Sequence, residues 1–234
     1  MKALAIIPAR GGSKRIPEKN IKSFVGKPII SYSIETALNS RLFDEVMVST
    51  DSEKIAAVAK QYGARVPFMR SAANSNDHAT IFDTVAEIID RYKTEGKYPE
   101  IVCCFFATAP FVREEILKVG FEKVKSGDFD SAFTVQRFSY PIFRALRQNQ
   151  SGEMSMFWPE HLNTRSQDLP GAFHDAGQVY FAKTEALLRD QTFFTRKAFG
   201  IIMNHEDALD IDTEEDWDFA EKLFVLRRTA PNRK

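Results

Sequence analysis

The sequence predicts an α/β fold of three layers, in which helices cover a mostly parallel, Rossmann-like sheet. Short runs of apolar and β-branched residues alternate with helical patterns through the first half of the chain, as they do in parallel sheets. The first run, residues 3–7, is apolar throughout, which is typical of a strand buried on both faces. A chain of 234 residues can enclose such a core within one domain.

The elements of the first half follow from the spacing of apolar residues. A polar loop over residues 8–20 separates the first strand from a helix that begins near Pro28 and carries its apolar stripe to Leu38. Gly63 ends the next helix, because glycine readily adopts the conformation that closes helices. In chain order we expect a strand at 45–49, a helix over 55–62, a strand at 65–68, a helix over 80–92, a strand at 101–106, a helix over 113–125 and a strand at 131–136.

The pattern changes after the last of these strands. Residues 137–170 show no clean helical period, and their aromatic side chains are scattered among polar ones. So long a stretch is unusual for a structureless loop in a compact domain, and we interpret it as an extended arm that packs against a second subunit. We therefore expect one domain over 1–228, with 137–170 as a dimerisation arm and 229–234 as a flexible tail. The elements after the arm are strands at 178–182 and 199–203 and a helix from 213 or 214 to 228.

The charge balance excludes several classes of partner. Lys plus Arg and Asp plus Glu both number 32, so no overall field attracts nucleic acid or an anionic membrane, and an anionic ligand needs a local cluster of cations. No apolar stretch approaches the ~20 residues that span a membrane. The first apolar run is too short for a signal peptide, so we expect a cytoplasmic protein. Cys103 and Cys104, the only cysteines, lack the spacing of a zinc or redox site.

Residues 8–20 form a basic loop with the sequence Pro-Ala-Arg-Gly-Gly-Ser-Lys-Arg-Ile-Pro-Glu-Lys-Asn. Gly11 and Gly12 let the backbone approach a ligand closely. The ending of a Walker loop and the glycine fingerprint of dinucleotide sites are both absent. The pattern leaves two interpretations open, a phosphate site and a solvated basic turn. Four cations lie within ten residues of one another, namely Arg10, Lys14, Arg15 and Lys19.

Two aspartates near the end of the chain indicate a metal site. Asp210 and Asp212 alternate on a short extended piece, so their carboxylates point to the same side. Mg²⁺ takes one or two such oxygens together with substrate phosphates. Thr213 and Asp216 match a helix cap with an acidic third position, which explains those two residues without a metal. A cap does not explain Asp210, and we therefore favour metal binding for Asp210 and Asp212.

Together the two segments resemble the sialic-acid cytidylyltransferases. Arg10-Gly-Gly-Ser-Lys14, followed by Lys19-Asn20, is similar to the amino-terminal nucleotide motif of that family. Asp210-Ile-Asp212, followed by Asp216, is similar to its carboxyl-terminal motif. The resemblance covers nearly the whole chain and implies a nucleotidyltransferase sheet. Between the motifs, the family's order is kept by Ser49-Thr-Asp51, Arg70 with Asp77, Thr108-Ala-Pro110 and Gly177 to Tyr180.

The resemblance implies roles on the CTP side. It implies that Arg10 and Lys19 hold the CTP phosphates and stabilise charge in the transition state. It also implies that Asp210 and Asp212 bind Mg²⁺ and that Asp212 activates the attacking hydroxyl. The other nucleotide-binding residues that it implies are Gly12, Ser13, Lys14, Asn20, Arg70, Asp77, Thr80 and Thr108. A purely structural role stays open for the last three residues. Asp77 can stabilise its own loop, Thr80 can cap a helix and Thr108 can end a strand.

The acceptor side departs from the enzymes that use N-acetylneuraminic acid. Phe106 stands where they typically have glutamine. The stretch from Arg165 to Pro170 carries one extra residue, and the stretch that begins at His174 is changed. These stretches are similar to the branch of the family that activates pseudaminic acid, which implies that Arg165 grips the sugar carboxylate. The other acceptor residues that the resemblance implies are Phe106, His174, Gln178, Tyr180, Phe193 and Phe194, although most of the 20 Phe are expected in the core.

The resemblance thus implies a Mg²⁺-dependent enzyme that transfers CMP from CTP to pseudaminic acid, a nine-carbon 2-keto sugar acid, for surface or flagellin glycosylation. The resemblance and the aromatic arm both predict a homodimer. Two alternatives keep the reaction but change the acceptor to N-acetylneuraminic or legionaminic acid. A third is a CTP-binding module that has lost catalysis, which the intact pair Asp210 and Asp212 disfavours. An oxidoreductase is the weakest alternative, because the glycine fingerprint is absent.

Overall fold

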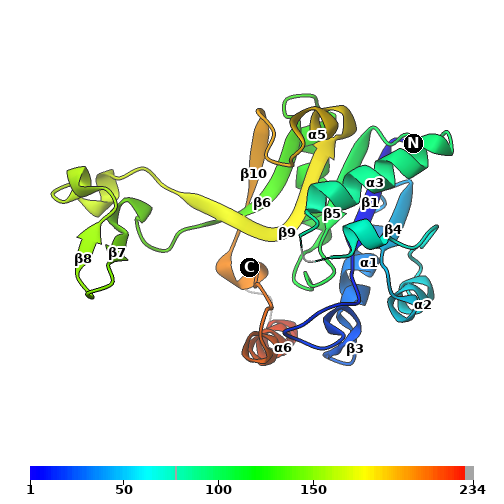
Figure 1. Ribbon diagram of the computed structural model, residues 1–234, viewed down its shortest axis with the longest axis horizontal. Helices are drawn as coiled ribbons and strands as arrows, with labels where there is room; N and C mark the ends of the chain where they lie inside the picture. The colour runs from blue at the N-terminus through cyan, green and yellow to red at the C-terminus, as the bar shows by residue number, and fades with distance from the viewer. Residues whose placement is uncertain (77, 230–234) are drawn as a thin grey trace.

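The computed structural model describes residues 1–76 and 78–229. Its centre is a six-stranded sheet in the order β10-β6-β9-β5-β1-β4 (Figure 1). Five strands run in one direction, and β9 runs antiparallel to its neighbours β5 and β6, so the predicted mostly parallel sheet is confirmed. The six strands are β1 (Ala3–Pro8), β4 (Glu45–Ser49), β5 (Ile101–Phe105), β6 (Ser131–Arg137), β9 (Phe173–Lys183) and β10 (Ala198–Met203). Two short pairs lie outside the sheet, β2 (Ser23–Phe24) with β3 (Lys27–Pro28) and β7 (Leu146–Gln148) with β8 (Met154–Met156).

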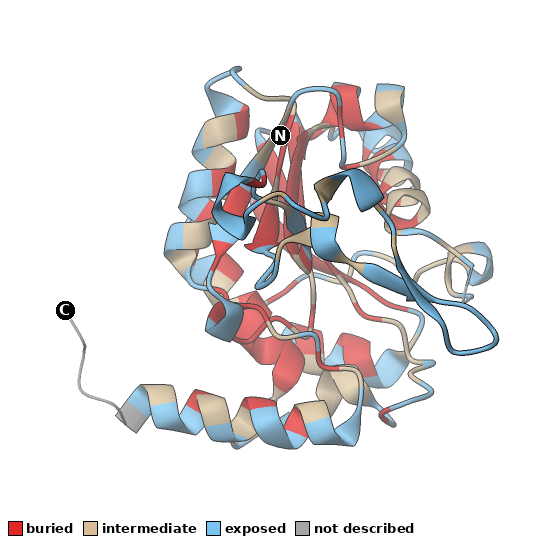
Figure 2. Ribbon diagram, turned by 90° about the vertical axis from the view of Figure 1, so that its left-hand side faces the viewer, coloured by how far each residue is buried: buried red, intermediate tan, exposed pale blue. Residues whose placement is uncertain are grey.

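Helices cover both faces of the sheet and complete the three predicted layers (Figure 1). Side chains of α1, α2 and α4 share one apolar cluster with Ala5, while side chains of α3 and α5 share another with Leu4. Neighbouring residues of β1 therefore face opposite layers, which is why this strand is apolar at every position. Figure 2 shows the buried residues concentrated along the sheet. The helices are α1 (Ile29–Ser40), α2 (Glu53–Gln61), α3 (Ile81–Thr94), α4 (Glu114–Lys125), α5 (Thr184–Asp190) and α6 (Glu214–Thr229).

None of the described helices is long and apolar enough to cross a membrane. The last helix, α6, continues to Thr229, the first residue of the predicted tail. The rest of that tail, 230–234, lies outside the described residues.

A third apolar cluster joins the two ends of the chain. Ile16 of the basic loop and Ile211, which stands between the two aspartates, are both buried in it. Trp217 of α6 packs edge-on against Phe24, with ring centroids 5.6 Å apart. Burial of these side chains holds the basic loop and the acidic segment next to each other.

The short strand expected at 65–68 does not form. Arg65 makes an isolated parallel bridge to β4, donating its N–H to the Val46 carbonyl at 2.9 Å and accepting from the Val48 N–H at 2.8 Å. The next donor of this ladder would be residue 67, which is a proline and has no N–H. Four features were not anticipated, namely the β2–β3 pair, α5, the β7–β8 pair and the start of β9 at Phe173 rather than at residue 178.

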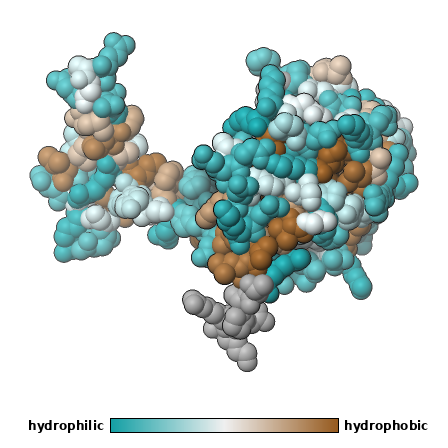
Figure 3. All heavy atoms as spheres, turned by 90° about the horizontal axis from the view of Figure 1, so that it is seen from below, coloured by the Kyte–Doolittle hydropathy of each residue, from teal (hydrophilic) through white to brown (hydrophobic). Residues whose placement is uncertain are grey.

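The predicted arm projects from the body of the molecule between β6 and β9 (Figure 1). It carries the β7–β8 pair and a small aromatic cluster in which the Phe143 ring lies 5.4 Å from that of Trp158 and 5.1 Å from that of His161, centroid to centroid. Apolar side chains are interspersed with polar ones over its surface (Figure 3). Its exposed large apolar residues include Tyr140, Leu146, Met154, Phe157 and Leu162.

Gly120 marks the tightest approach between a helix and the sheet. A Cβ atom there would lie 2.5 Å from Cδ2 of Phe181 on β9 and 2.9 Å from Cδ1 of Ile201 on β10. Gly120→Ala is therefore expected to lower the free energy of unfolding by about 1–3 kcal/mol, because the added methyl overpacks the interface. Urea unfolding followed by circular dichroism measures this. Val119→Ala, at an exposed site of α4, is the control and is expected to change stability by less than about 0.5 kcal/mol.

Candidate active site

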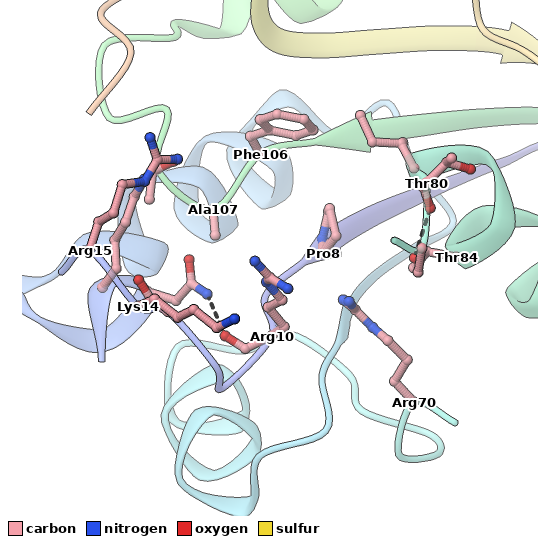
Figure 4. Close-up of a pocket in the computed structure, with 15 residues that line it drawn as sticks. Pro8, Arg10, Lys14, Arg15, Arg70, Thr80, Thr84, Phe106 and Ala107 are labelled. Atoms are coloured by element: carbon pink, nitrogen blue, oxygen red, sulfur yellow. Dashed lines mark hydrogen bonds between the residues drawn. The ribbon is translucent and has the colours of Figure 1, made fainter. Parts of the chain in front are cut away.

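A pocket of about 480 Å³ opens where β1 and β5 end (Figure 4). Ligands of open α/β sheets bind at these carboxyl ends of parallel strands. Of the predicted nucleotide-binding residues, Gly12 does not line the pocket, and Asp77 lies outside the described residues. The lining residues are Pro8, Arg10, Ser13, Lys14, Arg15, Lys19, Asn20, Arg70, Ala79, Thr80, Ile81, Thr84, Phe106, Ala107 and Thr108.

The basic loop is shaped by contacts at both of its ends. The Gly11 N–H donates to Oδ1 of Asp51 at 2.7 Å, and the Asn20 side-chain amide donates to the Arg10 carbonyl at 3.0 Å. A Cβ atom on Gly11 would lie 3.0 Å from Cβ of Ser52, whereas one on Gly12 would meet no atom of the described chain within 4 Å. A side chain at position 11 would therefore be tightly packed against Ser52, whereas position 12 has open space around it.

Arg70 brings a mostly buried cation to the opposite wall of the pocket (Figure 4). Its guanidinium donates to Oγ of Ser49 at 3.0 Å and to the Ser49 carbonyl. Burial lowers the pKa of Arg70, and the nearby Asp51 carboxylate opposes that shift. The chain beyond Arg70 is held by Glu87 of α3, which accepts from the Ser71 hydroxyl at 2.8 Å. A cation held in a site of reduced hydration is suited to bind an anion or a polar base.

Thr80 has the capping role that the sequence left open. Its hydroxyl accepts from the Asp83 N–H at 3.1 Å, and Oδ2 of Asp83 accepts from the Thr80 N–H at 2.9 Å, which together form a capping box at the start of α3. The same residue also lines the pocket. Its cap does not exclude a ligand contact, so its role in binding stays a prediction.

The structure brings Asp212 beside the basic loop. Its Oδ2 lies 2.8 Å from Nη1 of Arg15, and its Oδ1 lies 3.3 Å from Nζ of Lys19. Asp216 forms the predicted cap, accepting from the Thr213 N–H at 2.8 Å and also from the Asp212 N–H at 3.1 Å. The cap therefore fixes the backbone of Asp212 while leaving its carboxylate directed at the two cations.

Asp212 lies close enough to Asp210 to influence the ionisation of Asp210. Burial raises the pKa of Asp210, the charge of Asp212 raises it further, and the charges of Lys19 and Arg15 act in the opposite direction. The carboxylates of Asp210 and Asp212 are thus both close to two cations, in an environment that is partly shielded from water.

An aromatic wall extends from Phe106 across β9. The Tyr180 ring lies 5.6 Å from Phe106 and 5.6 Å from Phe193, centroid to centroid. Phe194 packs on Phe133 at 4.5 Å. The Tyr180 hydroxyl donates to Oδ2 of Asp175 at 2.6 Å, and burial together with this bond raises the pKa of Tyr180, so the hydroxyl stays protonated. Four predicted acceptor residues therefore belong to one aromatic cluster. Tyr180 and Phe193 are buried in the apolar core, Phe106 lines the pocket and Phe194 is exposed, and the role of all four in binding stays a prediction.

Three other predicted acceptor residues do not join this wall. Arg165 lies in the projecting arm, where its guanidinium pairs with Asp168 at 2.7 and 3.2 Å. His174 lies at the start of β9, with its ring 4.9 Å from that of Phe138. Gln178 is buried, and its amide contacts backbone carbonyls. The arm that contains Arg165 projects away from the sheet (Figure 1), and Arg165 does not line the pocket.

The family is decided by comparison with known proteins. The family model described as cytidylyltransferase matches residues 4–230. The chain belongs to the cytidylyltransferase family. The resemblance drawn from the two terminal motifs is thereby confirmed.

The relatives of this cytidylyltransferase act on sugar acids, according to their names. The chain is 44% identical to the pseudaminic acid cytidylyltransferase of Campylobacter jejuni over 98% of its own length and 99% of that protein. It is 31% identical to the CMP-N,N'-diacetyllegionaminic acid synthase of Legionella pneumophila over 98% of this chain and 99% of that one. The structure of a CMP:2-keto-3-deoxy-manno-octonic acid synthetase complexed with CTP superposes with a TM-score of 0.70 at 19% identity, covering 97% of this chain and all of that one, which shows the shared fold.

The carboxylates of this cytidylyltransferase suit a magnesium ion. Among the described residues, no group of three or more His, Cys, Asp or Glu side chains is arranged to hold a metal ion. A two-carboxylate site would therefore need further oxygens from substrate phosphates, as Mg²⁺ sites in phosphoryl-transfer enzymes commonly have. Burial raises the pKa of Asp210 and the neighbouring charge of Asp212 raises it further, so a divalent cation held between the two carboxylates would be favourable, and Asp210 and Asp212 fit this ion.

Sequence reasoning missed three residues at the site. Arg15 was counted among the loop cations but not assigned, since the pattern does not say which cation faces Asp212. Asp175 and Phe133 had no signal, because a carboxylate and an aromatic on separate strands carry no shared motif.

Proposed function

We propose that this cytidylyltransferase transfers CMP from CTP to the anomeric hydroxyl of pseudaminic acid, releasing pyrophosphate and giving CMP-pseudaminic acid for surface or flagellin glycosylation. The observation that carries the reaction is the contact of Asp212 with Arg15 and Lys19 at a pocket lined by further cations. The choice of acceptor is supported by the higher identity to pseudaminic acid cytidylyltransferases than to the legionaminic acid synthase. We place the reaction in the cytoplasm, where CTP is available.

The basic loop supplies the charge that the reaction needs. Arg10, Lys14 and Lys19 bind the triphosphate, and the same cations stabilise the negative charge that develops as the bond between the α-phosphorus and the bridging oxygen breaks. Arg70 and Thr108 orient the cytidine part at the opposite wall. Because these groups come from three different segments held by the core, they are positioned before the substrate arrives.

Asp212 acts on the acceptor. Its carboxylate takes the proton of the anomeric hydroxyl, whose oxygen forms the new bond to the α-phosphorus while pyrophosphate leaves. Lys19 and Arg15 hold the carboxylate in place for this step. When bound by Asp210 and Asp212, Mg²⁺ supplies charge neutralisation at the phosphates and lowers the pKa of the attacking hydroxyl. Phe106, which lines the pocket, and the exposed Phe194 lie on either side of the buried Tyr180 and pack against acyl substituents of the acceptor.

Pyrophosphate release with CTP, Mg²⁺ and pseudaminic acid tests the proposal, with N-acetylneuraminic and legionaminic acids run in parallel. Release with pseudaminic acid at a kcat/KM at least 10-fold above the other acids is the expected outcome. Preference for another acid would keep the reaction class and replace the acceptor. CTP binding without release from any acid would instead support the non-catalytic module.

We also propose that the enzyme is a homodimer in which the arm reaches the partner's site. The exposed apolar residues of the arm favour burial against a second copy, and that docking would bring Arg165 to an acceptor. Sedimentation equilibrium is expected to give twice the chain mass. Leu146→Asp combined with Phe157→Asp is expected to raise the dimer dissociation constant at least 10-fold. Val119→Asp on α4 serves as the exposed control, and a wild-type protein that sediments only as a monomer would refute the dimer.

A further inference from the structure

Gln136, at the end of β6, is a buried side chain that neither the pocket nor the aromatic wall explains. It is 7% exposed, and its amide group makes two hydrogen bonds to the segment that follows β10. Nε2 donates to the Ala208 carbonyl at 2.9 Å and to the Asn204 carbonyl at 3.2 Å. The Gln136 side chain thus binds two backbone carbonyls of the segment that leads to Asp210.

Gln178 on the neighbouring strand continues this contact by one residue. It is 4% exposed, and its Nε2 donates to the Ala176 carbonyl at 3.0 Å and, at a longer 3.5 Å, to the Leu209 carbonyl. Its Oε1 is buried without a donor among the described residues. The contact with the Leu209 carbonyl is the longer of the two bonds of Gln178, so this side chain adds to a hold on the segment that comes mainly from Gln136.

The β6–β9 pairing between the two glutamines is irregular. Its register shifts between Phe133 and Val135, and the Thr134 hydroxyl accepts from the backbone N–H groups of Gln178 and Val179 at 3.3 and 3.1 Å. A bulge of this kind redirects side chains at the end of a strand. Here it accompanies two amides that both point toward residues 204–209.

The held carbonyls stand directly before the catalytic segment. Ala208 and Leu209 precede Asp210, and their carbonyls accept from the side-chain amides of Gln136 and Gln178, respectively. On the other side, Ile211 is buried and Asp216 accepts from the Asp212 N–H. The backbone of the two aspartates is therefore fixed from the sheet by the glutamines and from α6 by the cap.

We propose that Gln136 and Gln178 are positioning residues that set the placement of Asp210 and Asp212 relative to Lys19. This inference rests on the proposed function. It assigns the glutamine pair a role in the reaction through the aspartates, without contact to substrate. For Gln178, the proposal replaces the expected contact with the acceptor by a hydrogen bond to the backbone carbonyl of Leu209.

The test compares two variants of β6, each of which loses buried hydrogen bonding. Gln136→Met keeps the size of the side chain and removes both donors. Ser131→Ala at the other end of β6 removes the buried bond to the Thr195 hydroxyl, which measures 2.8 Å, and serves as the control. For Gln136→Met we expect kcat to fall about 10-fold and the half-saturating Mg²⁺ concentration to rise, as for other residues that act through a metal ligand. The KM for CTP is expected to stay within about 2-fold, because the basic loop is not in contact with Gln136.

Hydrogen exchange supplies a readout independent of activity. In Gln136→Met, peptides covering 204–213 are expected to exchange at least 5-fold faster, while peptides of β1 and β5 keep the wild-type rate. Unchanged exchange in 204–213, or an equal fall of kcat in Ser131→Ala, would overturn the proposal. If Gln136→Met does not fold, Gln178→Met is measured in the same way. A wild-type protein without pyrophosphate release would refute the proposed function, and the exchange comparison would still decide whether the glutamines hold the segment.

Discussion

Asp212→Asn is expected to lower turnover on the order of 10³-fold without unfolding the protein. The change keeps the size of the side chain but removes the charge that Arg15 and Lys19 contact. An amide does not take the proton of the attacking hydroxyl, and as a neutral ligand it would hold Mg²⁺ less tightly than a carboxylate does. A loss of about 4 kcal/mol in transition-state stabilisation corresponds to a rate reduced about 10³-fold. Initial rates of pyrophosphate release at saturating CTP and acceptor measure the effect.

Asp218→Asn is the matched control for this variant. Asp218 is exposed on α6, six positions beyond Asp212, and it carries the same charge. Its replacement is expected to leave turnover within about 2-fold of the wild-type value. Circular dichroism spectra of both variants should match the wild type. Wild-type turnover in Asp212→Asn would exclude Asp210 and Asp212 as the metal site.

Lys19→Met is expected to lower kcat/KM for CTP by about 10²–10³-fold. Lys19 lines the pocket, is only 17% exposed at its side chain and lies 3.3 Å from Oδ1 of Asp212. Its removal takes away a cation that stabilises the leaving phosphates and, at the same time, leaves the carboxylates of Asp210 and Asp212 with less compensation. Steady-state kinetics with CTP as the varied substrate measure both kcat and KM.

Lys54→Met tests whether the loss of any lysine near this loop has the same consequence. Lys54 pairs with Glu18 of the basic loop at 2.7 Å, but its side chain is 75% exposed and does not line the pocket. Exposed pairs contribute little, so kcat/KM is expected to stay within about 2-fold. Equal losses in both variants would show that Lys19 acts through the shape of the loop rather than through its charge at the phosphates.

Local concentration of charge matters in this protein because its overall charge is zero. The pocket gathers Arg10, Lys14, Arg15, Lys19 and Arg70, and the carboxylate of Asp212 lies against two of them. The resulting field is confined to the site, so an anionic nucleotide is attracted there without a general affinity for polyanions.

The sequence alone predicted most of the elements, because each depends on local patterns. The apolar period placed β1, β4 and β5 within one residue of their observed bounds. The expected end of the second helix at Gly63 agrees with its φ of 92°, which other residues rarely adopt. The strand predicted at 65–68 does not form, because pairing also needs a backbone N–H donor at residue 67, which proline lacks. The hairpin of the arm and α5 carry weaker periodicity and were missed.

By itself, the sequence determined the family and the three-layer α/β fold, since motifs and apolar spacing are properties of the chain read in order. Only the tertiary structure decided which groups meet. Lys19 and Asp212 are 193 positions apart, and burial of Ile16, Ile211 and Trp217 in one cluster places them in contact. The hold of Gln136 on Ala208 likewise exists only after β6 and the segment beyond β10 have packed together. Such contacts follow from how distant segments share a core, and no local spacing encodes them.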